Sequence, residues 1–387
     1  MNASSIKAAP APAPIDSPKQ STKVFTSNGP SNLELILLCL ITCACFVVVL
    51  THFQSYSATV LSVGDNAQYI SAAQAIQHWD LQSTQTRQGW GLSYLIALLS
   101  IFHLSDQVSL VCISIAASLG SVLIVRSLWG PWIAAFFAIL NFPWIQASFL
   151  GGSEPLFALL LFGSFWFCRR ERSKENWGLS AVLAALATVT RAVGIFGLAA
   201  LGLNLLLRKE YRKLAICVAV AALIGFLYLL PFWIAFHDPL YQFHRRASVG
   251  DWDSGQLLTW PFRIIVVSFL YYHGPWTNVL LTGGWIALSV VALFRMGAKL
   301  YRDRGGEHLN EQIFAISYLT FLFCYNSLEW ARWDFHRFVI PVIPLILLSI
   351  DRWLPKSRYV IYPLCVISSA LAACSAVGIQ NVIRTVF

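Results

Sequence analysis

Charged side chains are scarce in this chain of 387 residues: Asp, Glu, Lys and Arg together make up only 12% of it. A water-soluble domain carries about 25% of these residues, because they cover its surface. Hydrophobic residues make up 57% of the chain and the mean hydropathy is +0.64. They fall in long blocks instead of the stripes of a soluble amphipathic helix. The composition therefore excludes a soluble fold and predicts an all-α polytopic membrane protein.

The polar loops lack cysteine, since all nine cysteines lie within apolar stretches. No pair has the spacing of zinc ligands with partner histidines. This excludes both a disulfide framework and a metal cluster built on cysteine, and it favours a packing role for small apolar thiols. The chain also lacks a basic groove with interleaved aromatic residues, so its formal net charge of +9 does not indicate a nucleic-acid partner.

The basic residues instead cluster at the ends of apolar blocks, in residues 169–174, 208–213, 295–304 and 352–358. Such clusters mark cytoplasmic loops, so the number of spans between any two of them must be even. We expect residues 1–32, rich in Ala, Pro, Ser and Lys, to form a disordered cytoplasmic tail. Residues 33–387 then form one transmembrane catalytic domain.

We predict about eleven spans and one interfacial helix at 90–104, a stretch too short to cross comfortably. The predicted spans are 33–50, 108–125, 132–149, 155–167, 179–192, 194–207, 214–236, 279–294, 313–328, 338–350 and 360–377. This topology places three polar segments, 51–89, 237–261 and 329–337, together on the non-cytoplasmic side. The chemistry is expected there.

Two carboxylates of the outer segments are candidate catalytic residues. Asp65 follows Gly64 before a helical apolar pattern, so its side chain either caps that helix or accepts a proton from an alcohol. Glu154 precedes Pro155 at the mouth of a span, so it either faces the helix dipole or acts as a second carboxylate that orients the acceptor or helps to hold a divalent cation.

Arginines at the outer ends of spans are candidate phosphate ligands. Arg191 interrupts an apolar run and either snorkels to the headgroups or holds a lipid phosphate bidentately. Arg337 precedes a span broken by two prolines and either binds phosphate or pairs with Asp334 or Glu329. We group Tyr69, Arg87 and His336 with these arginines as candidate substrate-binding residues, because they share the same outer segments. A further outer loop, residues 237–246, mixes cations with aromatic side chains.

Five motifs in this order resemble the GT-C superfamily of integral membrane glycosyltransferases, which includes the protein O-mannosyltransferases and the lipid A aminoarabinose transferases. They are Gly-Asp-x-x-x-Tyr at 64–69, Ser-Glu-Pro-Leu-Phe at 153–157, Leu-Ala-Ala-Leu-Ala-Thr-Val-Thr-Arg-Ala-Val-Gly-Ile at 183–195, His-Asp-Pro-Leu-Tyr-Gln-Phe at 237–243 and His-Arg-Phe-Val-Ile-Pro-Val-Ile-Pro at 336–344. The resemblance implies transfer of a sugar from a polyprenyl-phosphate donor to a lipid, glycan or protein acceptor on the non-cytoplasmic face.

The resemblance also implies roles for individual residues. Asp65 matches the general base of the first outer loop, Glu154 the acid of the next outer turn, and Arg191 and Arg337 the ligands of the donor phosphate. Several members carry Asp-Glu or Asp-x-Asp where this chain has Asp65 and Asn66. We therefore assign no cofactor from the sequence. A divalent cation is kept as an alternative.

A second hypothesis is a transporter or flippase that moves lipid-linked sugars without bond chemistry, and a third is a non-catalytic membrane scaffold. A transporter is expected to show internal repeats and charges near the middle of its spans. The chain shows no such repeat, and its charges gather at the ends of its apolar blocks. Lacking a retention signal, the chain is expected in a bacterial inner membrane, among membrane lipids, with its active site facing outside.

Overall fold

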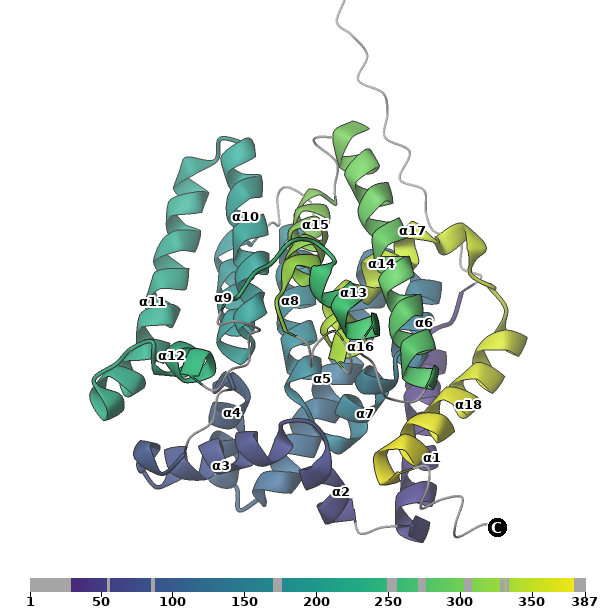
Figure 1. Cartoon of the computed structure of the whole chain (residues 1–387), viewed down its shortest axis with the longest axis horizontal. Coiled ribbons are helices and arrows are strands. Elements are labelled where there is room, and N and C mark those ends of the chain that lie inside the picture. Colours follow the sequence, from purple (N-terminus) through teal and green to yellow (C-terminus); the bar gives the residue numbers. More distant parts are fainter. Residues whose placement is uncertain are drawn as a thin grey trace, which may run out of the picture.

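The computed structural model describes residues 29–53, 56–84, 88–169, 176–248, 256–270, 276–302, 308–327, 331 and 334–378 (Figure 1). Among these residues the regular secondary structure is helical, apart from an isolated bridge between Leu258 and Tyr325. The all-helical class predicted from the hydropathy pattern is therefore confirmed. Most of the predicted N-terminal tail, together with Arg87 and Glu329, lies outside the described residues.

Five helices of the described chain are long and apolar enough to cross a membrane. They are α1 (Asn32–Phe53), α5 (Asp106–Trp129), α11 (Tyr211–Phe236), α14 (Trp276–Arg302) and α18 (Arg358–Val377). Each overlaps one of the predicted spans, because a run of about 20 apolar residues is what a bilayer requires. These helices are compatible with an integral membrane protein.

The predicted span at 132–149 is broken into two helices, α6 (Pro131–Ile139) and α7 (Phe142–Leu150), which meet at 78°. Asn141 occupies the break, and its Oδ1 accepts a hydrogen bond of 2.9 Å from the amide of Trp144, which caps α7. Its Nδ2 donates to the carbonyl oxygen of His336 at 2.7 Å. The broken backbone is tolerated because these side-chain bonds replace the missing helical ones inside the protein.

The described chain also contains shorter apolar helices. They are α4 (Gly91–Ser100), α8 (Ser153–Arg169), α9 (Trp177–Thr190), α10 (Ile195–Leu207) and α15 (Leu309–Cys324). The central one, α8, packs between α5 and α9. Five long helices, or six with the bent pair, do not confirm the predicted count of about eleven spans. The ten residues of α4 agree with the prediction that segment 90–104 is too short to cross.

The segment after Arg337 is interrupted at its prolines, as its sequence predicts. It forms α16 (Phe335–Phe338), the 3₁₀ turn η5 (Ile340–Val342) and α17 (Ile343–Ser349). The carbonyl oxygen of Phe338, at the end of α16, accepts a hydrogen bond of 2.8 Å from the hydroxyl of Tyr318 on α15. The short helix that carries Arg337 is therefore tied to the interior.

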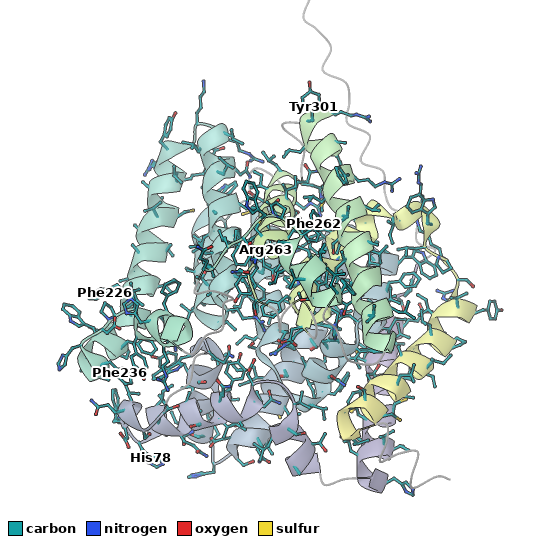
Figure 2. The ribbon with its side chains drawn as sticks, in the orientation of Figure 1. His78, Phe226, Phe236, Phe262, Arg263 and Tyr301 are labelled. Carbon is teal, nitrogen blue, oxygen red and sulfur yellow. The ribbon has the colours of Figure 1, made fainter. Side chains whose placement is uncertain are left out.

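Further short helices are α2 (Tyr56–Ser62), α3 (Asn66–Gln77), the turn η1 (Leu81–Ser83) and α12 (Tyr241–Ser248). Of these, α2 and α3 lie at one end of the molecule (Figure 1). Two more elements are α13 (Arg263–Leu270) and η6 (Asp351–Trp353). Figure 2 shows His78, just after α3, and Tyr301, near the end of α14, at opposite ends of the molecule. At the side, α11 exposes much of its surface, and Phe226 points outward (Figure 2).

We predict that Asn141→Ala lowers the free energy of unfolding by about 1–3 kcal/mol, because it removes a helix cap and leaves the carbonyl of His336 unpaired. Thermal unfolding in detergent measures the change. Asn176→Ala is the matched control, since Asn176 caps the exposed start of α9 through the amide of Leu179. Equal losses in the two variants would show that the bond to His336 adds nothing.

Candidate active site

Asp65 occupies the N-cap position of α3, as its sequence context predicts, but its carboxylate makes no capping hydrogen bond. Instead, Oδ2 of Asp65 accepts a hydrogen bond of 2.8 Å from Nη2 of Arg337. The preceding Gly64 has a left-handed φ of 53°, and a Cβ there would lie 3.4 Å from Nη2 of Arg337. The left-handed backbone favours glycine here, whereas a Cβ at this distance from the guanidinium would make an ordinary contact.

Glu154 lies in the first turn of α8 and is only 2% exposed. Its Oε1 accepts a hydrogen bond of 2.5 Å from Nη1 of Arg191 and a second from Nε of Arg337. Charge-assisted bonds of this kind hold a guanidinium in a fixed orientation. Glu154 therefore joins two arginines that lie 146 positions apart in the chain (337 minus 191). In this arrangement Oε1 of Glu154 is shared by the two guanidiniums.

Arg191 lies at the C-terminal end of α9 and turns into the protein, where its side chain is 14% exposed. Besides Glu154, its Nη1 donates to Oγ of Ser153 at 3.1 Å, and its guanidinium lies 5.4 Å from the ring centroid of Phe338. This geometry disfavours the alternative in which Arg191 snorkels to the headgroups. The aromatic face and the carboxylate together stabilise a cation in a site of low dielectric constant.

Tyr69 is buried one turn after Asp65 on the same face of α3, and its hydroxyl donates to Oγ of Ser153 at 2.8 Å. Asn66 fixes the start of this helix, because its Nδ2 donates to the carbonyl oxygens of Val60 and Leu150 at 2.8 and 3.1 Å. These bonds attach α3 to α7 and α8. The position of Asp65 is therefore determined by a rigid, hydrogen-bonded framework.

A cavity of about 810 Å³ opens beside this network. Asp65, Arg191, Asp334 and Arg337 line one part of it. Apolar residues of α9, α10 and α11 also line it, among them Ala185, Leu198, Ala221, Gly225, Leu229 and Phe232. Its volume lies within the range of sites that bind drug-sized molecules, and few polar groups in an apolar wall are typical of such sites.

Two of the predicted outer segments meet at the edge of this cavity. The side chain of Gln242, on α12, accepts a hydrogen bond of 2.5 Å from the hydroxyl of Tyr228 and donates one of 2.9 Å to the carbonyl oxygen of Gln88. Near the end of α11, Nε2 of Gln82 donates to the carbonyl oxygen of Ala235 at 2.7 Å. A hydrogen bond therefore joins described residues of the predicted segments 51–89 and 237–261.

His336 is not among the residues that line the cavity. Burial, and secondly the charge of Arg337, lower the pKa of His336 from its usual 6.5 to about 4. The imidazole is therefore neutral at pH 7, and the cationic charge beside the cavity comes from Arg191 and Arg337. The third basic candidate, Arg87, lies outside the described residues.

Asp334 and Ser153 are site residues that the sequence did not single out. Asp334 was considered only as a partner for Arg337, but the structure pairs Arg337 with Asp65 and Glu154. Burial raises the pKa of Asp334, and the charge of Arg337 opposes this shift. The sequence signal for Asp334 is its position shortly before Arg337, and the signal for Ser153 is its hydroxyl immediately before Glu154.

No cluster of metal-ligating side chains occurs among the described residues. They contain no group of three or more histidine, cysteine, aspartate or glutamate side chains that could hold one. The two predicted carboxylates, Asp65 and Glu154, both bind the guanidinium of Arg337. Their charge is already compensated by arginine, so the donor set gives no support to the divalent cation kept as an alternative.

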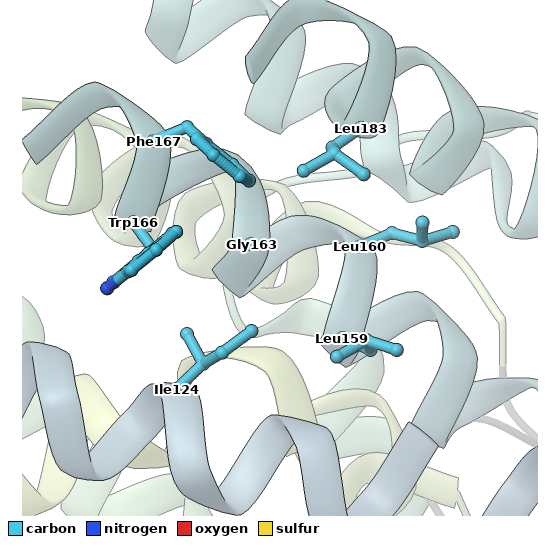
Figure 3. Close-up of a pocket in the computed structure, with 7 residues that line it drawn as sticks. All are labelled: Ile124, Leu159, Leu160, Gly163, Trp166, Phe167 and Leu183. Carbon is cyan, nitrogen blue, oxygen red and sulfur yellow. The ribbon is translucent and has the colours of Figure 1, made fainter. Parts of the chain in front are cut away.

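A second cavity, of about 260 Å³, lies between α5, α8 and α9 (Figure 3). Its lining consists of Ile124, Leu159, Leu160, Gly163, Trp166, Phe167 and Leu183. These residues place aliphatic and aromatic side chains around the space (Figure 3). No acid or cation lines it, in contrast to the larger cavity.

No family model, curated protein or solved structure matches this chain. The resemblance to membrane glycosyltransferases therefore rests on the order of the motifs, and the site has to be interpreted from its own geometry.

We predict that Glu154→Gln destabilises the fold by about 3–5 kcal/mol, because it leaves two buried arginines without their shared counter-charge. Unfolding of the purified protein in detergent measures this loss. Asp351→Asn is the control: Asp351 makes an exposed pair of 2.7 Å with Lys356, which is worth about 1 kcal/mol or less. A Glu154→Gln variant as stable as this control would contradict the structural role of Glu154.

We also predict a contribution of His336 to acid lability. Its folded-state pKa of about 4 lies below its usual 6.5, so the unfolded chain binds its proton more readily. The stability of the fold should therefore fall as the pH is lowered from 6.5 towards 4. His336→Gln should flatten this part of the pH dependence in thermal unfolding scans, and an unchanged pH dependence in this variant would contradict the prediction.

Proposed function

We propose that the protein is a glycosyltransferase of the GT-C type, which moves a sugar from a polyprenyl-phosphate donor to an acceptor hydroxyl on the non-cytoplasmic face of a membrane. One observation carries the proposal: the cavity of about 810 Å³ is lined both by arginines and carboxylates and by apolar side chains of α9, α10 and α11. A lipid-linked sugar phosphate has the same two parts. We further propose that the acceptor is a lipid, a glycan or a protein. The proposed location is a bacterial inner membrane.

The donor phosphate would bind Arg191 and Arg337. Arg337 uses Nε for Glu154 and Nη2 for Asp65, while its Nη1 makes no hydrogen bond with any described residue. Since Glu154 holds both guanidiniums in place, little reorganisation is needed when an anion arrives. Guanidiniums suit phosphate because their planar donors match its oxygens in pairs.

The polyprenyl chain would lie against the apolar wall formed by α9, α10 and α11. Ala221, Gly225 and Leu229 follow one another at four-residue intervals on α11, so they share one face of that helix. This helix also exposes much of its surface away from the protein, so the apolar part of the cavity lies beside an outward-facing helix. A lipid tail could therefore reach the cavity from the bilayer.

Asp65 would accept the proton of the acceptor hydroxyl. The acceptor oxygen attacks the anomeric carbon, the bond between that carbon and the phosphate oxygen breaks, and its electron pair leaves with the phosphate. A phosphate on Arg337 competes with Asp65 for the guanidinium, which makes the carboxylate more available as a base at the moment of reaction. A single displacement of this kind inverts the anomeric configuration.

Purified protein incubated with a panel of polyprenyl-phosphate sugars should release polyprenyl phosphate and glycosylate an acceptor. We predict that Asp65→Asn lowers kcat about 10²–10⁴-fold while the fold is retained, because the base is lost. Arg337→Ala should abolish binding of polyprenyl phosphate. Asp351→Asn again serves as the control.

The outcome also separates this function from its alternatives. A transporter would move the lipid-linked sugar across vesicles without releasing polyprenyl phosphate, and a scaffold would do neither. Full transfer activity in Asp65→Asn would remove Asp65 from the mechanism.

A further inference from the structure

Asp334 is the carboxylate beside the cavity that the proposed mechanism does not use. It lies at the N-cap position of α16, yet its side chain makes no capping hydrogen bond. It makes no ion pair within the described part of the chain, where Arg337 is taken by Asp65 and Glu154. It lines the same cavity as Asp65, Arg191 and Arg337. Neither of the ordinary structural roles of an aspartate before a helix therefore accounts for it.

Among the described residues of this network, the charges are balanced without Asp334. Asp65 and Glu154 together offset Arg191 and Arg337, which are their partners in the ion pairs. An ionised Asp334 adds one uncompensated negative charge to this group, and the phosphate of a donor would add another. Like charges at close range in a site of low dielectric constant disfavour one another, so one of the two is expected to take up a proton.

Burial already favours the protonated form of Asp334. It raises the pKa of this carboxyl, and the negative charges of Asp65 and Glu154 act in the same direction. The positive charges of Arg337 and Arg191 oppose them. When a phosphate binds the two arginines, it neutralises the groups that favour ionisation. The arrival of the donor therefore strengthens the tendency of Asp334 to hold a proton.

We propose that Asp334 is a general acid, which donates its proton to the phosphate oxygen that leaves the anomeric carbon. This inference rests on the proposed function. The acceptor proton passes to Asp65, the electron pair of the broken carbon–oxygen bond passes to the phosphate oxygen, and the proton of Asp334 passes to that same oxygen. The products are the glycosylated acceptor and the monoprotonated polyprenyl phosphate. Transfer of the proton from Asp65 to Asp334 through water restores the resting site.

A general acid would favour the reaction because it lowers the negative charge of the leaving group. Without an acid, polyprenyl phosphate departs as a dianion, whereas its second pKa of about 6 makes the phosphate oxygen a good proton acceptor near neutral pH. A proton delivered during bond cleavage keeps the product a monoanion in a poorly solvated site. Two carboxylates in different surroundings can have different pKa values, so that one acts as the acid and the other as the base.

The decisive experiment compares Asp334→Asn with wild type across pH. The charged groups that influence the pKa of Asp334 are Arg337 on α16, Asp65 before α3, Glu154 on α8 and Arg191 after α9. Since the acid must be protonated, the wild-type kcat should fall as the pH rises past its pKa. Asp334→Asn should lower kcat about 10²–10⁴-fold, with little change in KM for the donor, and should lose this alkaline decline. Asp334→Glu, which restores a carboxylic acid, should recover part of kcat together with the decline.

A binding measurement gives a readout that does not depend on turnover. Titration of polyprenyl phosphate into the wild-type protein, in buffers with different ionisation enthalpies, should show uptake of a proton that is absent in Asp334→Asn. Asp351→Asn, which changes an exposed carboxylate of η6, should match wild type in both measurements.

The possible failures are distinguishable. If wild type neither binds polyprenyl phosphate nor transfers sugar, the proposed function falls and the role of Asp334 falls with it. If wild type is active and Asp334→Asn keeps kcat within about threefold with its alkaline decline, only the assignment of Asp334 is overturned. If Asp334→Asn fails to fold, Asp334→Glu is the deciding variant. An unchanged kcat and pH profile in Asp334→Glu would show that the position of the carboxyl group does not matter. That result would also overturn the assignment.

Discussion

The buried pairing of Glu154 with Arg191 and Arg337 is the interaction on which the site depends. Two guanidiniums brought into an apolar interior would repel each other, and each would be costly to desolvate alone. One shared carboxylate on α8 compensates both and leaves the side of the arginines that borders the cavity available. Asp65 then completes the balance from the start of α3. The cavity is therefore lined by fixed cations, which is the preorganisation that binding of an anion requires.

The broken helices of the fold are what allow this pairing. Asn141 ends one helix and starts the next, and it binds the backbone of the segment that carries Arg337. Pro341 interrupts the helix that would otherwise extend from Arg337 into the interior. Tyr318 binds the carbonyl at the end of α16. Each irregular backbone segment is satisfied by a side chain inside the protein, as a chain in contact with lipid requires.

Much of the site was predictable because few polar residues interrupt the apolar blocks. A charge in such surroundings is costly, so Asp65, Glu154, Arg191 and Arg337 stood out as functional candidates, and the structure brings these four together. Asp334 was less visible, because an acid beside an arginine suggests an ordinary ion pair. The structure shows that Arg337 pairs with Asp65 and Glu154 instead, and that Asp334 lines the cavity.

The sequence by itself determined the helical class, the long apolar helices and the set of polar residues available for chemistry, because these follow from composition and from local hydrophobic runs. It did not determine the bend between α6 and α7, the number of helices long enough to cross a membrane, or the partners of each charge. Those depend on contacts between segments far apart in the chain. A pairing such as that of Asp65 with Arg337, separated by 272 positions, has no local signature and exists only once the fold has formed.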